Sequence, residues 1–393
     1  MPCSAPARLL FIVNSLDFGG AEKQLVTLLN HLDPERFRMY LAYLKPGASL
    51  RPQLREERLA RVLCCSVRRW IDPRAVAQLR SLIATEQIDA VICTNQYSML
   101  YGYLARGARA GTRLATVFHS TLLYSYKEKA QMLLYRRLFR RCDLLLYVCE
   151  NQRRHWRGRG LRAAADAVVY NGIDSARYTD SLSSAERLKF RRSLGVGDDE
   201  YLIGLCSVLR PEKAHADLLA AIARLRARGI PAKALLIGDG PERALIEQAA
   251  ARLGITSYVR ITGFEPDVRP FIAACDVMTL VSHDETFSIA ALESMALGKP
   301  LVMSDVGGAR EQVIHGEQGF LFPAGDLDSL TTCLATLTAQ PLRLQFGEAA
   351  ARRARGHFSV QSMTSRFTSC MDNLLDRERI PADRTHPQRV RST

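Results

Sequence analysis

The segment Val277–Glu293, VMTLVSHDETFSIAALE, joins a short apolar run to a helical pattern through a polar turn. Its first five residues predict a buried strand, and the apolar spacing from Ile289 onward predicts a helix. Glu285 precedes the helix, and Glu293 follows eight residues later. The first amides of a helix have no partner within it and attract an anion. The segment therefore predicts an anion site at a strand end, flanked by two carboxylates that can bind hydroxyl groups.

An amphipathic helix with surface glutamates is the alternative explanation of this segment. Glu293, however, lies within Ala-Ala-Leu-Glu-Ser-Met-Ala-Leu, where nearly every neighbour is apolar or small. A carboxylate in such surroundings faces a site or is buried with a partner.

Short apolar runs and helical patterns alternate along the rest of the chain, which predicts right-handed βαβ units and parallel sheets. The expected strands of the first group are Leu9–Val13, Val91–Cys93, Ala115–Phe118, Leu144–Val148 and Val168–Tyr170. Those of the second group are Tyr201–Val208, Ala234–Ile237, Val259–Ile261, Val277–Val281 and Leu301–Met303. The expected fold class is α/β, with two doubly wound, Rossmann-like domains.

The domain boundary is expected near Gly195, where glycine and aspartate interrupt the pattern. A chain of 393 residues is too long for one ordinary core. We expect a first domain over 1–196 and a second over 197–358, with ligands at the carboxyl ends of the strands. The basic tail, 377–393, is expected to be disordered.

Composition and charge exclude several classes of protein. Hydrophobic residues at 47% and charged residues at 24% are globular averages, which exclude disorder, collagen and coiled coil as the main state. A net charge of +14 favours nucleic acid, an acidic membrane surface or phosphorylated ligands as partners. The ten cysteines include no CxxC pair, and the apolar runs are far shorter than the roughly 20 residues of a spanning helix. With no signal-peptide pattern, we expect a reduced, cytosolic protein.

Several glycines and charged residues follow the predicted strands. Gly19-Gly20 and Gly238 lie at strand-to-helix turns, where glycine lets a ligand approach the backbone; a tight turn without a ligand is the alternative. Arg210 and Lys213 lie between a strand end and a helix start, where cations can converge on a phosphate; a solvated loop is the alternative. His119 ends a strand, and a structural role is its alternative.

Together these motifs resemble a known family. Glu285-x7-Glu293, followed by SMALGKP and SDVGG, resembles the retaining nucleotide-sugar glycosyltransferases of family 4, which have the two-domain GT-B fold. Four other segments match this family in the same order, and the resemblance spans nearly the whole chain: Gly19–Glu22, Asn171–Asp174, Arg210–Lys213 and Gly238–Pro241. The fold implies that a C-terminal helix, 359–376, packs back on the first domain.

The resemblance implies a role for each carboxylate and for the helix start. Glu285 would position the donor sugar, and Glu293 would bind the ribose hydroxyls. The diphosphate would be held by the Gly19-Gly20 turn across the cleft and by three amides, those of Phe287, Ser288 and Ile289. Gly238 belongs to the same donor site.

The resemblance also implies that Arg210 and Lys213 neutralise the leaving group in place of a metal, and that His119 contacts the donor. Many members carry an arginine five residues before the lysine, where this chain has Val208. Arg210 is expected to take the place of that arginine.

The expected activity is retaining, metal-independent transfer of a hexose from a nucleoside diphosphate sugar, such as a UDP-sugar, to an acceptor hydroxyl. The product would be a cell-surface polysaccharide, lipopolysaccharide or glycolipid, and no cofactor beyond the donor is expected. One alternative is an epimerase of the same fold, which needs no acceptor. The other is a non-catalytic basic protein that binds nucleic acid; it requires stacking aromatics or base-reading helices. We expect no nucleic-acid partner.

The basic residues are concentrated between Thr121 and Arg162, where eleven Lys and Arg face three acidic residues. Within this stretch, Tyr124–Arg141 places apolar residues at helical spacing among the cations, a pattern typical of a helix on an anionic leaflet. An ordinary helix that covers the sheet with a basic outer face is the alternative. Because many family members build lipid-linked glycans, we expect a cytoplasmic protein that is peripheral on the inner face of the plasma membrane. Its acceptor would be a glycan or a lipid-linked saccharide.

Overall fold

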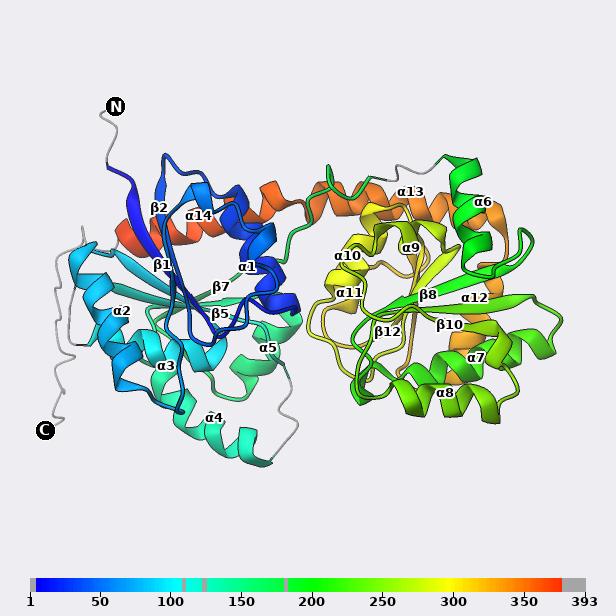
Figure 1. The fold of residues 1–393 in the computed structure, drawn as a ribbon, viewed down its shortest axis with the longest axis horizontal. Coiled ribbons are helices and arrows are strands. Elements are labelled where there is room, and N and C mark those ends of the chain that lie inside the picture. Colours follow the sequence, from blue (N-terminus) through cyan, green and yellow to red (C-terminus); the bar gives the residue numbers. More distant parts are fainter. Residues whose placement is uncertain (1–4, 108–110, 122–125, 180–182, 377–393) are drawn as a thin grey trace, which may run out of the picture.

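A computed structural model of the chain describes residues 5–107, 111–121, 126–179 and 183–376, including all side chains in these ranges except those of 126–130 and 134. Two α/β units lie side by side, each built around a parallel sheet (Figure 1). The expected fold class is thereby confirmed. The tail predicted to be disordered, 377–393, lies outside the described residues.

The first unit contains a seven-stranded parallel sheet in the order β3-β2-β1-β4-β5-β6-β7. Its strands are β1 (Ala7–Val13), β2 (Phe37–Tyr43), β3 (Leu59–Cys64), β4 (Ala90–Thr94), β5 (Arg113–Phe118), β6 (Leu144–Tyr147) and β7 (Ala165–Val168). Its helices are α1 (Gly20–His31), α2 (Pro73–Thr85), α3 (Asn95–Arg106), α4 (Tyr126–Phe139) and α5 (Glu150–Gly158), with 3-10 turns η1 (Arg51–Gln53) and η2 (Glu56–Arg58).

The second unit contains a six-stranded parallel sheet in the order β10-β9-β8-β11-β12-β13. Its strands are β8 (Tyr201–Cys206), β9 (Ala232–Ile237), β10 (Val259–Ile261), β11 (Val277–Leu280), β12 (Leu301–Ser304) and β13 (Gly319–Phe322). The helices that follow β8 along the chain are α7 (His215–Ala227), α8 (Arg243–Arg252), α9 (Arg269–Ala274), α10 (Ile289–Ala296), α11 (Ala309–Gln312), α12 (Leu327–Thr336), α13 (Gln340–His357) and α14 (Val360–Asp376), with 3-10 turns η3 (Pro211–Lys213) and η4 (Thr256–Tyr258).

Each sheet is buried on both faces because helices cover both sides. In β1, Leu10 and Ile12 face one core, whereas Leu9 and Phe11 face the other. This follows from the period of two along a strand. With neither face in water, the strands are nearly continuous apolar runs, which is why most of them are visible in the sequence.

Each sheet has one point where the strand order reverses: between β1 and β4 in the first, and between β8 and β11 in the second. Loops at such a point diverge to opposite faces of the sheet and leave a crevice for a ligand. The turn 14–19 follows β1, and residues 282–288, the polar turn within the segment quoted at the outset, follow β11. The fold therefore places the predicted site segments at the crevices.

The two C-terminal helices, α13 and α14, link the two units. The long C-terminal pair runs along both, with α13 on the second unit and α14 on the first (Figure 1). Phe367 of α14 is buried against Phe11 of β1, with 6.0 Å between ring centroids. The expected return of the C-terminal helix to the first unit is thereby confirmed.

Helix α6 (Ser184–Ser193) packs on the second unit, although it precedes the boundary predicted at residue 196. Its Arg191 guanidinium donates to the Ala274 carbonyl at 2.8 Å and to Asp276 Oδ2 at 3.0 Å, and Phe190 packs on Phe271. A buried guanidinium must find such partners, and they lie beside the second sheet. α6 therefore belongs with the second unit, although the predicted boundary assigns it to the first domain.

The sequence pattern missed three strands and displaced one. β2 and β3 each contain an arginine that interrupts the apolar run. β13, Gly319–Phe322, begins with a glycine and was not among the expected strands. The run predicted at Val168–Tyr170 is displaced, because β7 ends at Val168. Tyr170 has already left the sheet, and its hydroxyl donates to Glu311 Oε2 at 2.9 Å.

We expect Phe367→Ala to lower the free energy of unfolding by about 3–5 kcal/mol, because it removes a buried aromatic ring and leaves a cavity. Equilibrium urea denaturation measures this change. Leu344→Ala on α13 is the control, since that side chain is 61% exposed and its loss should change stability by less than about 0.5 kcal/mol. Equal effects of the two substitutions would contradict the packing of α14.

Candidate functional site

A cleft of 440 Å³ lies between the two units and is lined by residues of both. The first unit contributes the turn before α1 and the start of that helix. The second contributes the loops after β8, β9 and β11, together with α10. All of the predicted site residues except His119 line this cleft: Gly19, Gly20, Arg210, Lys213, Gly238, Glu285, Phe287, Ser288, Ile289 and Glu293.

Lys213 and Glu285 form an ion pair within the cleft. Lys213 Nζ lies 2.6 Å from Glu285 Oε2, and each side chain is about one-fifth exposed. The Thr286 amide donates to the other carboxylate oxygen at 3.2 Å. The exposed Arg210 side chain lines the same cleft, and none of the described residues forms an ion pair with it. Two cations and a carboxylate therefore surround one end of the cleft.

Glu293 is buried, with only 3% of its surface exposed, and its Oε1 atom is shared by two partners. Lys23 of α1 forms a salt bridge with it, and the Tyr178 hydroxyl donates to it at 2.7 Å. Burial disfavours the Lys23 ammonium, but the Glu293 carboxylate and Tyr178 outweigh this effect and raise the Lys23 pKa above its ordinary value. The lysine therefore stays charged, and the pair joins the first unit to α10.

The start of α10 departs from the expectation that three amides are available to an anion. The amide of Ser288 donates to Gln312 Oε1 at 3.1 Å, because the buried Gln312 amide needs partners and also donates to the Ser288 carbonyl. The Ser288 hydroxyl accepts from the Ala291 amide as the helix cap. Phe287 is buried against Tyr170 and Phe358. The binding roles of these residues stay predictions.

Two glycines in or near the cleft lie so close to a neighbouring group that a side chain would crowd it. A Cβ atom on Gly20 would lie 3.1 Å from Ile289 Cδ1, so the turn before α1 sits directly against the start of α10. A Cβ atom on Gly307 would lie 1.7 Å from the Glu285 carbonyl oxygen, and φ is +54° there. Only glycine fits at 307, in the SDVGG motif that follows β12.

His119 is not brought into the cleft. It lines a separate 40 Å³ cavity beneath α1, and its amide donates to Asn95 Oδ1 at 2.8 Å. Burial lowers the pKa of His119 to about 4, so the ring is neutral near pH 7. Gln24, Leu25 and Leu28 of α1 line the same cavity as His119. In this structure His119 does not line the predicted donor site.

Five residues that the sequence did not single out hold the units together in or beside the cleft. Lys23 and Tyr178 bind Glu293, as described above. Glu311 Oε2 and Oε1 accept from the amides of Glu150 and Asn151, at 2.8 and 2.7 Å, at the start of α5. Phe18 and Phe264 meet across the cleft, with 4.6 Å between ring centroids. Lys23 directly follows the Gly19–Glu22 motif and Phe18 directly precedes it, and this was the available signal; the other three residues give none.

The described part of α4 presents its apolar residues to the core. Met132, Tyr135 and Phe139 are buried, whereas Leu133 and Arg137 are exposed. The apolar stripe predicted for a membrane surface is thus used to cover the sheet, and a basic outer face remains. Part of the predicted stretch, 122–125, and the side chains of 126–130 and 134 lie outside the description. Among the described helices, none is long and apolar enough to cross a bilayer.

Acidic and metal-binding side chains do not gather in the described ranges: no group of three or more His, Cys, Asp or Glu there could hold a metal ion.

Comparison with known families finds two matches that together span most of the chain. Residues 18–177 match the model described as Glycosyltransferase Family 4, and residues 186–353 match Glycosyl transferases group 1. Among solved structures, Anabaena Alr3699/HepE in complex with UDP is similar, with a TM-score of 0.81 and 25% identity over 93% of this chain and 100% of that chain.

Two curated relatives illustrate the range of the matches. N-acetyl-alpha-D-glucosaminyl L-malate synthase of Bacillus anthracis is 29% identical over 53% of this chain and 54% of its own length. GDP-mannose-dependent alpha-(1-6)-phosphatidylinositol monomannoside mannosyltransferase of Mycolicibacterium smegmatis is 28% identical over 69% of this chain and 73% of its own length. With several relatives, the chain matches only about half of their length.

We expect Lys23→Met to destabilise the protein by roughly 1–3 kcal/mol, because it leaves the Glu293 carboxylate buried without its cation. Glu293→Gln in the same chain should recover part of this loss, since a neutral amide needs no counter-charge. Urea denaturation of the two single variants and the double variant measures the coupling. Strict additivity of the two changes would contradict the ion pair.

Proposed function

Since this chain belongs to the family 4 glycosyltransferases of the GT-B fold, we propose that it transfers a sugar from a nucleoside diphosphate sugar to an acceptor hydroxyl. The observation that carries the proposal is the cleft itself. It brings together Arg210, the Lys213–Glu285 pair, Glu293 and the start of α10, facing the Gly19-Gly20 turn. These groups come from distant parts of the sequence, and a purely structural role does not account for their convergence.

The charges of the cleft suit the parts of such a donor. Lys213 and Arg210 can neutralise the diphosphate, while the positive end of α10 adds to the field. The second oxygen of Glu293 is available for a ribose hydroxyl, because Lys23 and Tyr178 both bind Oε1. The turn at Gly238 lies on the same cleft and offers room for the base.

The proposed reaction breaks the bond between the anomeric carbon and the diphosphate and forms one to the acceptor oxygen. The acceptor proton leaves with the departing phosphate oxygen. Negative charge grows on the diphosphate, where Lys213 and Arg210 lie, and positive charge grows on the sugar ring, near the Glu285 carboxylate. We propose that attack occurs on the face the diphosphate leaves, so that the anomeric configuration is retained, and that the two cations do the work of a metal.

The donor base and the acceptor follow from the similar proteins by analogy. UDP is bound in the Anabaena structure, whereas the mycobacterial relative uses GDP-mannose. We propose a UDP-hexose as the first donor to test, and a glycan or lipid-linked acceptor. The epimerase alternative predicts a new sugar without any acceptor, whereas a transferase yields at most slow hydrolysis.

We expect Lys213→Ala to lower kcat/KM by about 10²–10³, as the loss of one preorganised oxyanion donor does. Thermal shift with UDP and GDP sugars identifies the donor first, and proton NMR of the product then reports the anomeric configuration. Lys189→Ala is the control, since this exposed lysine on α6 lies outside the cleft. Near-normal turnover by Lys213→Ala, or an inverted product, would contradict the mechanism.

We also propose that the protein is cytoplasmic and binds the inner face of the plasma membrane through charge. The basic outer face of α4 and the arginines that follow it would contribute about 1 kcal/mol per cation near an anionic leaflet. Because the apolar side of α4 is buried, this association should be electrostatic rather than insertive.

Liposome flotation should therefore recover the protein with anionic vesicles at low salt and lose it at high salt. The double variant Arg137→Glu/Arg141→Glu should abolish recovery, whereas Arg252→Glu on α8 should not. All three arginines are exposed. Equal recovery with neutral and anionic vesicles, or recovery that resists high salt, would contradict this proposal.

A further inference from the structure

The loop between β8 and α7 carries two of the proposed site residues, Arg210 and Lys213, and a side-chain hydrogen bond joins its two ends. Ser207 is the first residue after β8, and His215 is the first residue of α7. Ser207 Oγ lies 3.0 Å from His215 Nε2. Ser207 lines the donor cleft, whereas His215 does not. The bond therefore links the wall of the cleft to a residue outside it.

The His215 ring is buried and neutral. Burial, together with the nearby Lys213 ammonium, lowers the pKa of His215 to about 4, so the ring carries no charge near pH 7. A neutral imidazole has one nitrogen that donates and one that accepts, and it needs a partner when it is buried. Among the described residues, the Ser207 hydroxyl is its hydrogen-bond partner. Because a hydroxyl can both donate and accept, the Nε2 atom can keep this bond in either tautomer of the ring.

The backbone just before His215 is in an unfavourable conformation. Ala214 is left-handed, with φ +50° and ψ +41°, which is disfavoured for a residue other than glycine. It also stands at the N-cap of α7, where its side chain gives the helix no hydrogen bond. At the other end of the loop, the Leu209 amide donates to the Asp239 carbonyl at 3.0 Å and holds the residues next to β8. The bond to Ser207 gives the α7 end of the loop an attachment to β8 as well.

The tip of the same loop is attached to the turn that carries Glu285. The Glu212 carbonyl accepts from the His283 amide at 2.9 Å, and Lys213 Nζ lies 2.6 Å from Glu285 Oε2. The loop is therefore held at its base by β8 and at its tip by the turn after β11. Both attachments determine where the Lys213 ammonium lies in the cleft.

We propose that His215 is a positioning residue for the transfer reaction. Its hydrogen bond to Ser207 holds the start of α7 against the end of β8, and so holds Lys213 where the diphosphate departs. A displacement of a reacting group by about 1 Å can lower a rate by about 10²-fold, so a contact outside the cleft can control turnover. The inference rests on the proposed transferase function and adds a residue that acts through Lys213 rather than on the donor.

Slow hydrolysis of the donor tests this role without a known acceptor, because water takes the place of the acceptor hydroxyl. The probe is whichever of UDP-glucose, UDP-galactose, UDP-N-acetylglucosamine and GDP-mannose gives the largest thermal shift, and chromatography follows release of the nucleotide. His215→Leu should lower kcat about tenfold and change the donor KM by less than about threefold. Ser207→Ala should lower kcat to a similar extent, and the double variant should be no worse than either single one. His215→Gln, whose amide can reach the position of Nε2, should keep at least about one-third of the wild-type kcat.

Lys213→Ala provides the readout that a merely structural role would not change. In this background, His215→Leu should cause no further loss of kcat, because the group that it positions is already absent. Thr331→Val is the matched control, since it removes another buried hydrogen bond of the second unit, from Thr331 Oγ1 to the Leu327 carbonyl at 2.6 Å. Its kcat should equal that of the wild type. Urea denaturation checks that each variant is folded under the assay conditions.

A wild-type kcat in His215→Leu would overturn the inference, and so would an equal loss of kcat in the Lys213→Ala background or in Thr331→Val. If His215→Leu does not fold, Ser207→Ala decides in both backgrounds, because removal of a partly exposed hydroxyl is a small change. A wild-type protein that hydrolyses its donor but gives one of these results retains the proposed function and loses only the role of His215. A wild-type protein that releases nucleotide from none of the donors fails at the proposed function, and the inference fails with it.

Discussion

The buried carboxylate of Glu293 is the constraint on which the arrangement of the two units depends. α10 is short and surrounded by apolar residues, so a charge within it requires a partner. The partners come from elsewhere: Lys23 from the first unit and Tyr178 from the chain between the units. Because both approach the same oxygen atom, the start of α1 is held against the start of α10, and Gly20 meets Ile289 there. This contact holds the two walls of the cleft together.

The charged side chains of the cleft are already arranged before any ligand enters it. Lys213 is paired with Glu285 at 2.6 Å, and Arg210 is left exposed nearby. In the proposed reaction, a doubly charged diphosphate would meet one cation that is already oriented by a carboxylate and another that is exposed beside it. Such preorganisation lowers the cost of arranging charge during a reaction. The Lys213 ammonium also offsets the charge of Glu285, so this carboxylate would repel a neighbouring anion less strongly.

The sequence was sufficient for the fold class and for most of the cleft, because both depend on local patterns. Parallel sheets covered on both faces give continuous apolar runs, and glycines or charges follow each run. It did not show that His119 lies beneath α1, because a strand end shows that a residue lies at the sheet edge but not which side of α1 it occupies. It could not find Tyr178 or Glu311, whose roles depend on how the two units meet. We also expected the Ser288 amide to be available to an anion. Its hydrogen bond is instead accepted by Gln312 Oε1, 24 residues further along the chain.

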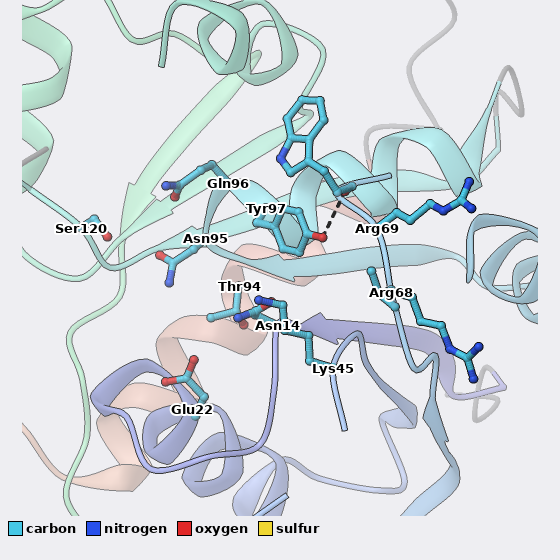
Figure 2. A pocket seen from close by; sticks show the side chains of 12 residues that line it. Asn14, Glu22, Lys45, Arg68, Arg69, Thr94, Asn95, Gln96, Tyr97 and Ser120 are labelled. Atoms are coloured by element: carbon cyan, nitrogen blue, oxygen red, sulfur yellow. Dashed lines mark hydrogen bonds between the residues drawn. The ribbon is translucent and has the colours of Figure 1, made fainter. Parts of the chain in front are cut away.

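A second, polar pocket of 560 Å³, whose lining includes Asn14, Lys45 and Asn95 (Figure 2), meets the cleft at a single turn of α1. Successive residues of a helix point about 100° apart, so Glu22 and Lys23 face different cavities from the same backbone. Glu22 lines the polar pocket, while Lys23 is fixed to Glu293 in the cleft. Because backbone hydrogen bonds hold the residues of this turn together, any displacement of the turn would move groups of both pockets at once.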